Sequence, residues 1–391
     1  MADLAIVVVG YNRPQCLSRL LDSLNRVAFD GHRIPLIISL DRSGNQAVQQ
    51  VAEAFAWNHG NKTVRTFPQR LGLRQHILTC GDLTNDFEHL VVLEDDLFAS
   101  PNLYRFATQA SECYRDDDRV AGIGLYSPLW NEACHRPFVP LDDPCDAYFM
   151  QYACSWGQIW SREKWIPFRD WYLQHGDDFQ PEPTIPPNVS HWSDHSWLKH
   201  HIRYCIETRR FFVYPRVGLT TNFSEMGQHN VGGETGYQVP LQEAYSKTYQ
   251  FPSLDRSRAI YDAYFESMAI SGALGLNPDE LCVDLYGVKK NGGHARYWLT
   301  LEPAAHKIVQ SFDLALRPHE ANILHGIPGE TIRLYDTSIA SRAPIPPRGR
   351  LEDLLVKYDV RNRSYKALLR YAAGVLFRQL KAKLFGRNRN R

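Results

Sequence analysis

The first hundred residues alternate between short apolar runs and segments whose apolar positions recur at helical spacing. Residues 5–9 form a continuous, largely β-branched run, which is typical of a strand buried on both faces of a sheet. Gly10 and Pro14 interrupt this run, and the leucines of residues 17–24 then follow the period of a helix. The pattern therefore predicts a buried strand followed by an amphipathic helix.

The same alternation continues to about residue 100. Further strands are predicted over residues 34–40, 63–66 and 89–93, and further helices over residues 46–57 and 73–80. Strands that alternate with helices favour a mostly parallel sheet with helices on both faces. We therefore expect an α/β, Rossmann-like fold in this part of the chain.

Beyond residue 100 the pattern changes twice. Helical patterns are first interrupted by aromatic and proline-rich loops, such as residues 181–187. Strand-like pieces then occur at 281–286 and 295–300, and the Asn-Gly-Gly sequence between them predicts a hairpin. We expect a first domain over residues 1–245 with halves at 1–105 and 106–245, a small β-rich domain over 246–343, and a linker with a basic amphipathic helix over 344–391.

The C-terminal segment is helical and basic by its pattern. Acidic residues are absent after Asp359, and apolar residues interleave with ten basic ones. The basic residues are Arg361, Arg363, Lys366, Arg370, Arg378, Lys381, Lys383, Arg387, Arg389 and Arg391. A helix of this kind can lie on an anionic membrane surface. The alternative is a helix that packs its apolar side on the protein and ends in a solvated tail.

Composition narrows the class of protein. Of the 391 residues, 44% are hydrophobic and 22% are charged, which is ordinary for a globular protein. The formal net charge of +1 gives no indication of a nucleic-acid partner.

The eight cysteines include no CxxC pair, so we interpret them as reduced thiols. No apolar stretch has the length of a signal sequence core or a membrane span. We expect a cytoplasmic protein that is peripheral on the inner face of the cell membrane.

Three adjacent carboxyl groups follow the predicted strand at 89–93. Glu94, Asp95 and Asp96 repel one another, and this grouping costs stability unless a cation compensates it. Mg²⁺ and Mn²⁺ take oxygen ligands and commonly share them with substrate phosphates. The alternative is an acidic helix start, which the helix dipole favours. The position directly after a buried strand favours the metal site.

Other polar residues also follow predicted strands. Tyr11, Asn12 and Arg13 come after the first strand, and Asp41 comes after the second. Ligands in open α/β sheets bind beyond the carboxyl ends of the strands. These residues and the three carboxylates are therefore expected to meet in one crevice.

Four segments in this order carry a resemblance to a known family. They are Val-Val-Gly-Tyr-Asn-Arg-Pro at 8–14, Asp-Arg-Ser-Gly at 41–44, Arg-Leu-Gly-Leu at 70–73 and Val-Leu-Glu-Asp-Asp-Leu at 92–97. Together they resemble the nucleotide-sugar-binding half of inverting GT-A glycosyltransferases, in particular N-acetylglucosaminyltransferase I and related bacterial polysaccharide glycosyltransferases. The resemblance covers residues 5–105 and continues more loosely to about 235. Its most specific piece is the Glu-Asp-Asp variant of the family's DxD motif.

The resemblance implies a role for each of these residues. Tyr11, Asn12 and Arg13 would line the base and ribose pocket, and Asp41 would bind the base edge. Arg70, Gly72 and Leu73 would close over the nucleotide. Asp96 would be the direct protein ligand of Mn²⁺ or Mg²⁺, while Glu94 and Asp95 would contact the donor sugar and ribose. The alternatives are a core position for the Tyr11 ring and a solvated helix start for Arg13.

Three later segments extend the resemblance. Trp156 and Gly157 match the family's Trp-Gly segment near the donor sugar; the alternative is that the aromatic residues of this segment, Trp160 in particular, belong to the core. The segment from His191 to Trp197 is similar to the family's Trp-Asp segment, so Asp194 would be the base that deprotonates the acceptor hydroxyl. Its spacing departs from the family pattern, and His191 and His195 are rivals for the role. Residues 222–229 resemble a loop over the diphosphate, in which His229 is a candidate second metal ligand; the alternative is an ordinary surface loop.

The function expected from this reading is metal-dependent, inverting glycosyl transfer. The donor would be a nucleotide-diphosphate sugar, by resemblance a UDP-sugar. The acceptor would be a hydroxyl of a glycan or glycolipid in surface polysaccharide biosynthesis. One alternative is a nucleotidyltransferase acting on sugar phosphates, although the segment from Gly10 to Arg13 is not the glycine-rich basic loop usual for that class. A second alternative is a non-catalytic carbohydrate-binding protein with the same fold.

Overall fold

The computed structural model describes residues 4–134, 136–176, 178–223, 237–243, 247–289, 294–342 and 365–385. The chain forms two compact units, Met1–Leu129 with Pro140–Ala269, and Trp130–Val139 with Ile270–Arg391. Four expected features lie outside the described residues: His229 with its surrounding loop, the turn at 291–293, the linker at 344–347, and five of the C-terminal basic residues, Arg361, Arg363, Arg387, Arg389 and Arg391.

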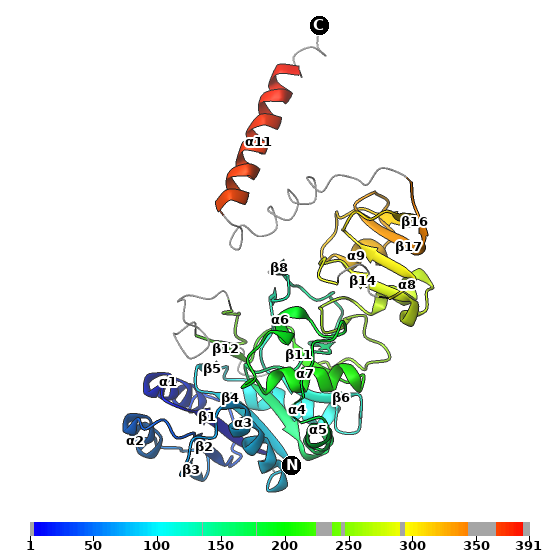
Figure 1. Ribbon diagram of the computed structural model, residues 1–391. Helices are drawn as coiled ribbons and strands as arrows, with labels where there is room; N and C mark the ends of the chain where they lie inside the picture. The colour runs from blue at the N-terminus through cyan, green and yellow to red at the C-terminus, as the bar shows by residue number, and fades with distance from the viewer. Residues whose placement is uncertain are drawn as a thin grey trace. The chain divides into compact units, whose positions relative to one another are not determined.

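The first unit is built on one large sheet (Figure 1), which has nine strands among the described residues, in the order β13-β9-β11-β6-β10-β4-β1-β2-β3. The strands are β1 (Leu4–Gly10), β2 (Leu36–Leu40), β3 (Lys62–Thr66), β4 (His89–Glu94), β6 (Val120–Gly124), β9 (Ala147–Met150), β10 (Gln158–Ser161), β11 (Phe211–Pro215) and β13 (Ile260–Tyr261). Strands β1–β4, β6 and β11 run in one direction, and β9, β10 and β13 run in the other. The predicted mostly parallel sheet is confirmed.

Helices cover both faces of this sheet, as predicted. They are α1 (Pro14–Leu24), α2 (Gln46–Ala54), α3 (Leu73–Gly81), α4 (Leu103–Cys113), α5 (Arg162–His175) and α7 (Leu198–Glu207). Ile6 and Val8 of β1 pack in one apolar cluster with residues of α1, α2 and α4. The opposite face meets α3, α5 and α7, where Trp160 of β10 lies 4.4 Å from Trp165 and 5.6 Å from Trp197 between ring centroids. Burial on two sides explains the continuous apolar runs of β1 and β4.

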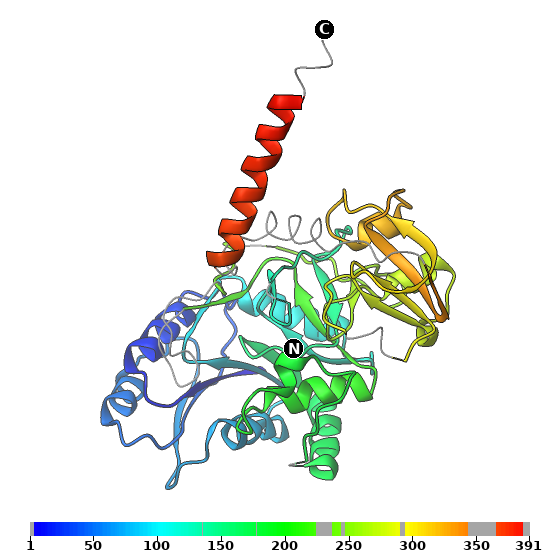
Figure 2. The same ribbon diagram turned by 45° about the horizontal axis from the view of Figure 1, so that its top comes forward.

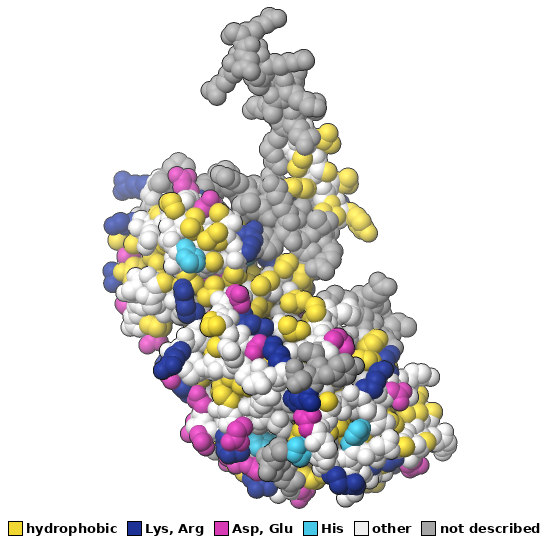
Figure 3. Space-filling view, turned by 180° about the vertical axis from the view of Figure 1, so that it is seen from behind, with side chains coloured by type: hydrophobic (Ala, Val, Ile, Leu, Met, Phe, Trp, Pro, Cys, Tyr) yellow, Lys and Arg dark blue, Asp and Glu magenta, His cyan; other side chains and the backbone are white. Residues whose placement is uncertain are grey.

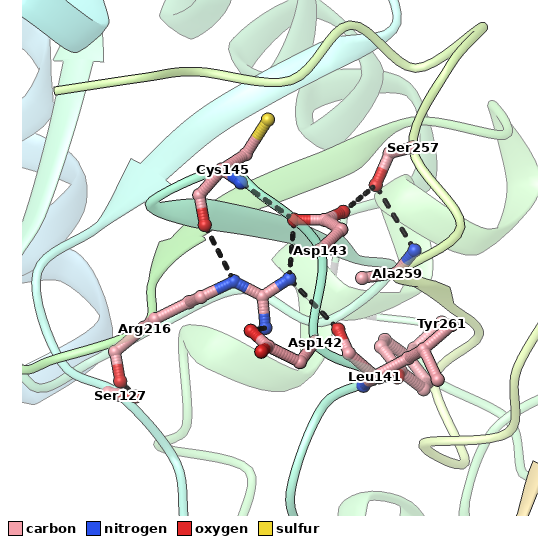
Figure 4. A network of polar contacts seen from close by, with 9 residues as sticks. All are labelled: Ser127, Leu141, Asp142, Asp143, Cys145, Arg216, Ser257, Ala259 and Tyr261. Atoms are coloured by element: carbon pink, nitrogen blue, oxygen red, sulfur yellow. Dashed lines mark hydrogen bonds and ion pairs between the residues drawn. The ribbon is translucent and has the colours of Figure 1, made fainter. Parts of the chain in front are cut away.

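A network of polar contacts connects the last part of the first unit to its sheet (Figure 4). Arg216, next to β11, donates from Nε to the Cys145 carbonyl at 2.8 Å and from Nη2 to Leu141 O at 2.9 Å and Asp143 Oδ1 at 2.8 Å. The hydroxyl of Tyr261 in β13 accepts a bond from the Leu141 N–H at 2.6 Å. These contacts and the pairing of β13 with β9 lie within the first unit, which extends to Ala269.

The second unit contains a separate small β domain, as expected (Figure 2). Its described part has a four-stranded sheet in the order β14-β15-β17-β16. The elements are β14 (Leu281–Asp284), β15 (Tyr297–Thr300), β16 (His306–Phe312), β17 (Ile332–Ala340), α8 (Ala269–Leu274) and α9 (Glu320–Leu324). Apolar residues of the strands and both helices form its core, which includes Ile270, Leu299 and Ile323.

The predicted hairpin in this domain is wrong. Strands β14 and β15 are parallel, with Leu281 opposite Tyr297 and Asp284 opposite Thr300. A tight turn can join only antiparallel strands, whereas parallel neighbours need a crossover of about a dozen residues, which residues 285–296 supply. The antiparallel partner of β15 is β17, far along the chain, so the local turn signal could not reveal it.

The remaining elements are short, apart from the C-terminal helix. They are β5 (Leu97–Ala99), β7 (Trp130–Asn131), β8 (Arg136–Pro137), β12 (Thr220–Asn222), α6 (Pro187–Ser190), η1 (Asp82–Asn85), η2 (Pro278–Glu280) and α11 (Tyr365–Phe385). The predicted C-terminal helix is thus present from Tyr365 onwards. Within the described ranges, no helix has both the length and the apolar character needed to cross a membrane. All eight cysteines are described, and none of them forms a disulfide bond.

Candidate active site

The carboxyl ends of three adjacent parallel strands meet at one edge of the large sheet. Strand β1 lies between β2 and β4, with Gly10 opposite Leu40 and Val9 opposite Glu94. The residues that follow these strands therefore start at the same edge. This is the convergence that the sequence predicts for Tyr11, Asp41 and the three carboxylates.

Arg13 connects the end of β1 to the carboxylates after β4. Its guanidinium forms an ion pair with Asp95, and its Nη1 lies 3.2 Å from Oδ2 of Asp96. Arg13 precedes Pro14, the first residue of α1, and its backbone has φ −112° and ψ 81°. A residue before proline is held out of the helical region, which fixes Arg13 in this non-helical position at the sheet edge.

One guanidinium faces three carboxyl groups in this cluster. Burial and then the charges of Asp96 and Asp95 raise the pKa of Glu94 to about 8, although Arg13 and a hydrogen bond from Trp197 act in the opposite direction. Burial also raises the pKa of Asp95 to about 6, against the effect of Arg13. The raised pKa values mean that burial disfavours the ionised carboxyl groups more than Arg13 stabilises them.

Two carboxylate oxygens of the cluster fit a metal ion. Asp95 Oδ2 and Asp96 Oδ1 are buried and have no hydrogen-bond partner, and a buried polar atom without a partner calls for a ligand. Across the described residues, no group of three or more His, Cys, Asp or Glu side chains could hold a metal. A metal here would therefore take one or two protein oxygens and complete its shell with phosphate and water, as Mg²⁺ commonly does.

Both carboxylate oxygens of Asp41, in contrast, accept hydrogen bonds from the protein backbone. Its Oδ1 accepts hydrogen bonds from the backbone N–H groups of Arg42 and Leu71, both at 2.8 Å, and its Oδ2 accepts one from Gly72 at 2.9 Å. Gly72 has φ +78°, a backbone conformation that side chains rarely adopt. Asp41 thereby anchors the segment that leads into α3. The structure adds this anchoring role to the base-edge role implied by resemblance.

The other nucleotide-side candidates gather around the same edge. The Arg70 guanidinium carbon lies 5.0 Å from the centre of the Tyr11 ring. The Asn12 carbonyl accepts a bond from Asn45 Nδ2 at 3.2 Å, and Asn45 also caps α2. Leu73 is the half-buried first residue of α3. The structure thus brings together the predicted residues that follow β1, β2 and β3.

A two-stranded ribbon links the carboxylates to Trp156 and Gly157. Strand β5 begins directly after Asp96 and pairs with β12, and Thr220 of β12 donates from Oγ1 to the Trp156 carbonyl at 2.6 Å. Gly157 has φ +93°, and a Cβ at this position would lie 3.0 Å from Thr220 Cγ2 and 3.2 Å from Leu125 Cβ. The close packing therefore requires glycine at 157 and holds Trp156 beside the ribbon.

Asp194 lies in the segment before α7 with its side chain 97% exposed. Its Oδ1 pairs at 2.9 Å with Nζ of Lys199, whose side chain is only 3% exposed. The hydrogen bond and charge of Lys199 lower the pKa of Asp194, and a carboxylate with a lowered pKa is a weaker base. The rivals His191 and His195 are also exposed, and His191 contacts the Pro187 carbonyl through Nδ1.

Sequence reasoning missed two residues of this segment. Trp197 is buried and hydrogen-bonded to Glu94, so it ties the start of α7 to the carboxylate cluster. Lys199 is the buried partner of Asp194. Trp197 belonged to the aromatic segment that drew attention to Asp194 and could have been included. A buried lysine carries no such signal, since lysines are mostly exposed.

Comparisons with known proteins give a similar fold and no family assignment. No protein-family model matches the chain, and no curated protein matches it. Similar solved structures include Staphylococcus aureus TarS 1–349 in complex with UDP-GlcNAc, at 13% identity and a TM-score of 0.38, over 60% of this chain and 62% of that one. GalNAc-T7 with UDP, GalNAc and Mn²⁺ is similar at 12% identity and a TM-score of 0.39, over 55% and 43% of the two chains.

A third similar structure is the mannosyltransferase PcManGT from Pyrobaculum calidifontis with GDP-Man and Mn²⁺, at 11% identity and a TM-score of 0.33, over 55% of this chain and 57% of that one. The chain thus spans less than two thirds of each of these proteins. At TM-scores below 0.5, these likenesses assign no function to this chain.

Proposed function

We propose that this chain is a metal-dependent glycosyltransferase of the GT-A type. It would move a sugar from a nucleotide-diphosphate donor, a UDP-sugar by resemblance, to a hydroxyl of a glycan or glycolipid acceptor in surface polysaccharide synthesis. The observation that carries the proposal is the carboxylate cluster at the end of β4. Glu94, Asp95 and Asp96 meet a single arginine there, and two of their buried oxygens have no partner.

The donor would lie along the strand ends, with its nucleoside beside β1 and β2. Tyr11 with the Arg70 guanidinium over its ring offers a flat surface for a base. Asp41, in addition to anchoring Leu71 and Gly72, could accept one more hydrogen bond on Oδ2 from the base edge. The diphosphate would then reach the carboxylates after β4.

Asp96, together with Asp95, would hold Mn²⁺ or Mg²⁺. Such a cation, when bound, neutralises charge on the diphosphate leaving group. Arg13 keeps the two aspartates in place through its ion pairs. Glu94, held by Trp197, would contact the donor sugar.

Asp194 would take the proton of the acceptor hydroxyl. The hydroxyl oxygen forms a bond to the anomeric carbon as the bond from that carbon to the diphosphate oxygen breaks, and a single displacement of this kind inverts the configuration. Because Lys199 lowers the pKa of Asp194, the proton transfer requires that acceptor binding weaken the Asp194–Lys199 pair. His191 and His195 remain the rival bases.

A donor screen tests the proposal. Thermal shifts would be measured with UDP-, GDP- and dTDP-sugars, each with Mn²⁺ and with a chelator. We expect stabilisation by one donor class that depends on Mn²⁺, followed by release of the nucleoside diphosphate. Pyrophosphate release from a nucleoside triphosphate and a sugar phosphate would instead identify a nucleotidyltransferase. Binding of sugars without any turnover would identify a carbohydrate-binding protein.

The C-terminal helix supports a second part of the proposal, attachment to an anionic membrane surface. Helix α11 contains five Lys or Arg residues and no acidic residue. Its described part exposes Leu369 at 70%, Leu376 at 59% and Phe377 at 68% (Figure 3). Basic residues near an anionic leaflet contribute about 1 kcal/mol each, and apolar side chains add a salt-resistant part. This would hold the enzyme at the cytoplasmic face, next to a lipid-linked acceptor.

Co-sedimentation with anionic liposomes tests the attachment. The full chain and a truncation before residue 351 would be compared at low and high salt. We expect the full chain to sediment with liposomes and the truncation to stay in solution. Equal behaviour of the two would mean that α11 is a packed helix with a solvated end.

A further inference from the structure

A small cavity lies in the first unit at the beginning of β4, the end of that strand opposite to the carboxylates. His89, the first residue of β4, and Ser161, the last residue of β10, face each other there. The cavity has a volume of about 20 Å³, which is room for one water-sized particle. Its polar lining residues are His89, Ser111, Tyr114, Arg115, Ser161 and Lys164.

Lys164, in the first turn of α5, places a buried cation beside this cavity. The residue is 5% exposed, and its Nζ donates to the Asp117 carbonyl at 2.8 Å. Among the described residues, Lys164 forms no ion pair within 4 Å. Burial lowers the pKa of Lys164, although the charges of Asp118 and Asp117 oppose this effect. A buried ammonium group without a close counter-charge is costly, so an anion at this position would stabilise it.

Three further lining groups have a buried polar atom without a hydrogen-bond partner in the described part of the chain. They are Nδ1 of His89, which is 2% exposed, Oγ of Ser111, which is 8% exposed, and Nε of Arg115. The ion pair of Arg115 with Glu112 uses Nη2, at 2.5 Å. Glu88 lies 3.7 Å from Nε2 of His89, which is beyond hydrogen-bond distance, so the imidazole proton can lie on Nδ1. All three groups can therefore donate a hydrogen bond to an occupant of the cavity.

The chemistry of this lining favours an anion over a water molecule. Two of the lining side chains, Arg115 and Lys164, are cations that can only donate hydrogen bonds, and no carboxylate is among the described lining residues. The Tyr114 hydroxyl donates to the Pro252 carbonyl at 2.7 Å. A water molecule accepts about two hydrogen bonds and leaves the charge of Lys164 uncompensated. A monatomic anion accepts a bond from every donor and supplies the missing charge.

We propose that this cavity binds one monatomic anion of the halide class, chloride in the cell, through Lys164, Arg115, His89 and Ser111. The anion would connect the beginning of β4 to α4, which contains Ser111, and to α5, which contains Lys164, and it would stabilise the first unit. The carboxylates proposed to hold a metal follow the other end of β4. The anion site is therefore independent of the proposed function.

The test measures melting temperatures of the full chain while chloride replaces gluconate at constant ionic strength. Lys164→Met removes the charge and keeps an unbranched side chain, and Ser111→Ala removes one hydroxyl. Lys247→Met is the matched control, because Lys247 is paired with Asp146 at 2.7 Å and does not line the cavity. Crystals soaked in bromide would locate the occupant by its anomalous scattering.

We expect chloride to raise the melting temperature of wild type with saturation, as mass action requires for one site. The apparent chloride affinity should fall at least ~10-fold in Lys164→Met, fall less in Ser111→Ala and stay unchanged in Lys247→Met. Ser111→Ala provides the comparison if Lys164→Met does not fold. The inference is overturned if chloride and gluconate act alike on wild type, if both cavity variants respond as wild type does, or if the cavity holds a water molecule without anomalous signal. Bromide in the cavity without a chloride effect on melting would mean binding at crystal concentration only and would equally overturn it.

Discussion

The ends of β2 and β4 lie one strand apart at the same sheet edge, yet their carboxylates are satisfied in opposite ways. Asp41 after β2 accepts three backbone hydrogen bonds, from Arg42, Leu71 and Gly72. Asp96 after β4 shares one arginine with Asp95, and its Oδ1 is buried without a partner. Asp41 completes its bonding within the fold, whereas two buried oxygens of the carboxylates after β4, Asp95 Oδ2 and Asp96 Oδ1, are left without a hydrogen-bond partner.

This difference shows that a carboxylate at the end of a buried strand can either support the fold or be available to a ligand. Both aspartates follow buried strands, so the sequence pattern treats them alike. The hydrogen bonds of the two aspartates distinguish them. A carboxylate oxygen that is fully hydrogen-bonded supports the structure, whereas one without a partner is available to a ligand. Substitutions at the two ends should therefore affect different properties.

The largest effect is expected at the end of β4. Asp96→Ala removes the proposed metal ligand and should lower sugar transfer by at least ~10²-fold, the scale of losing one main electrostatic contact in a transition state. Stability should not fall, because the change removes one of three repelling carboxylates. Initial rates of nucleotide release and a melting curve measure the two effects. Turnover within a few-fold of wild type would refute the metal assignment.

Asp194→Asn is the next largest change. It keeps the shape of the side chain and removes its basicity, so transfer should fall by ~10²-fold, the usual scale for a general base, while donor affinity is retained. Asp142→Asn is a matched control, since Asp142 is another exposed carboxylate, 98% accessible, beside an arginine. If transfer persists in Asp194→Asn, the base is His191 or His195.

Asp41→Ala should have the reverse profile of Asp96→Ala. It leaves the partly buried backbone N–H groups of Leu71 and Gly72 without their acceptor, which should lower the free energy of unfolding by about 2 kcal/mol. Asp41→Asn keeps one carbonyl oxygen and should lose less. Urea unfolding of the three proteins measures the series. An unchanged unfolding midpoint in Asp41→Ala would remove the contrast between the two strand ends.

His76 supplies a smaller, pH-dependent test on the Asp41 side. Burial lowers its pKa to about 4, and its Nε2 lies 2.8 Å from the Ser39 hydroxyl of β2. The neutral form therefore stabilises the fold above the unfolded pKa of about 6.5, and this contribution is lost as the pH falls towards 4. Between pH 7 and 5, wild type should lose roughly 1–2 kcal/mol more than His76→Gln. Equal losses in urea unfolding would contradict the assignment.

The elements that can be predicted from the sequence are those whose pattern of apolar and polar residues has a single structural explanation. Residues 5–9 and 89–93 are apolar throughout because helices cover both faces of the sheet, and the polar residues that follow them meet because parallel strands end at one edge. The α/β class and the convergence of Tyr11, Asp41 and Asp96 follow from these two facts alone.

The parts that could not be predicted depend on contacts between distant segments. Strand β15 pairs in parallel with β14 and antiparallel with the distant β17, and no local pattern encodes this arrangement. The ion pair of Asp194 needs a buried Lys199, and the ring of Trp156 contacts those of Tyr126 and Tyr237, which come from other segments. The chain has many aromatic and charged residues, and the sequence does not indicate which of them will contact one another in the fold.

The most direct test of the central claim is calorimetric titration of UDP into wild type and Asp96→Ala, each with Mn²⁺ and with a chelator. If the carboxylates after β4 hold a metal that binds the diphosphate, wild type will bind UDP in the presence of Mn²⁺ and lose most of this affinity with the chelator. Asp96→Ala will bind UDP weakly under both conditions. Equal, metal-independent affinity in the two proteins would contradict the account.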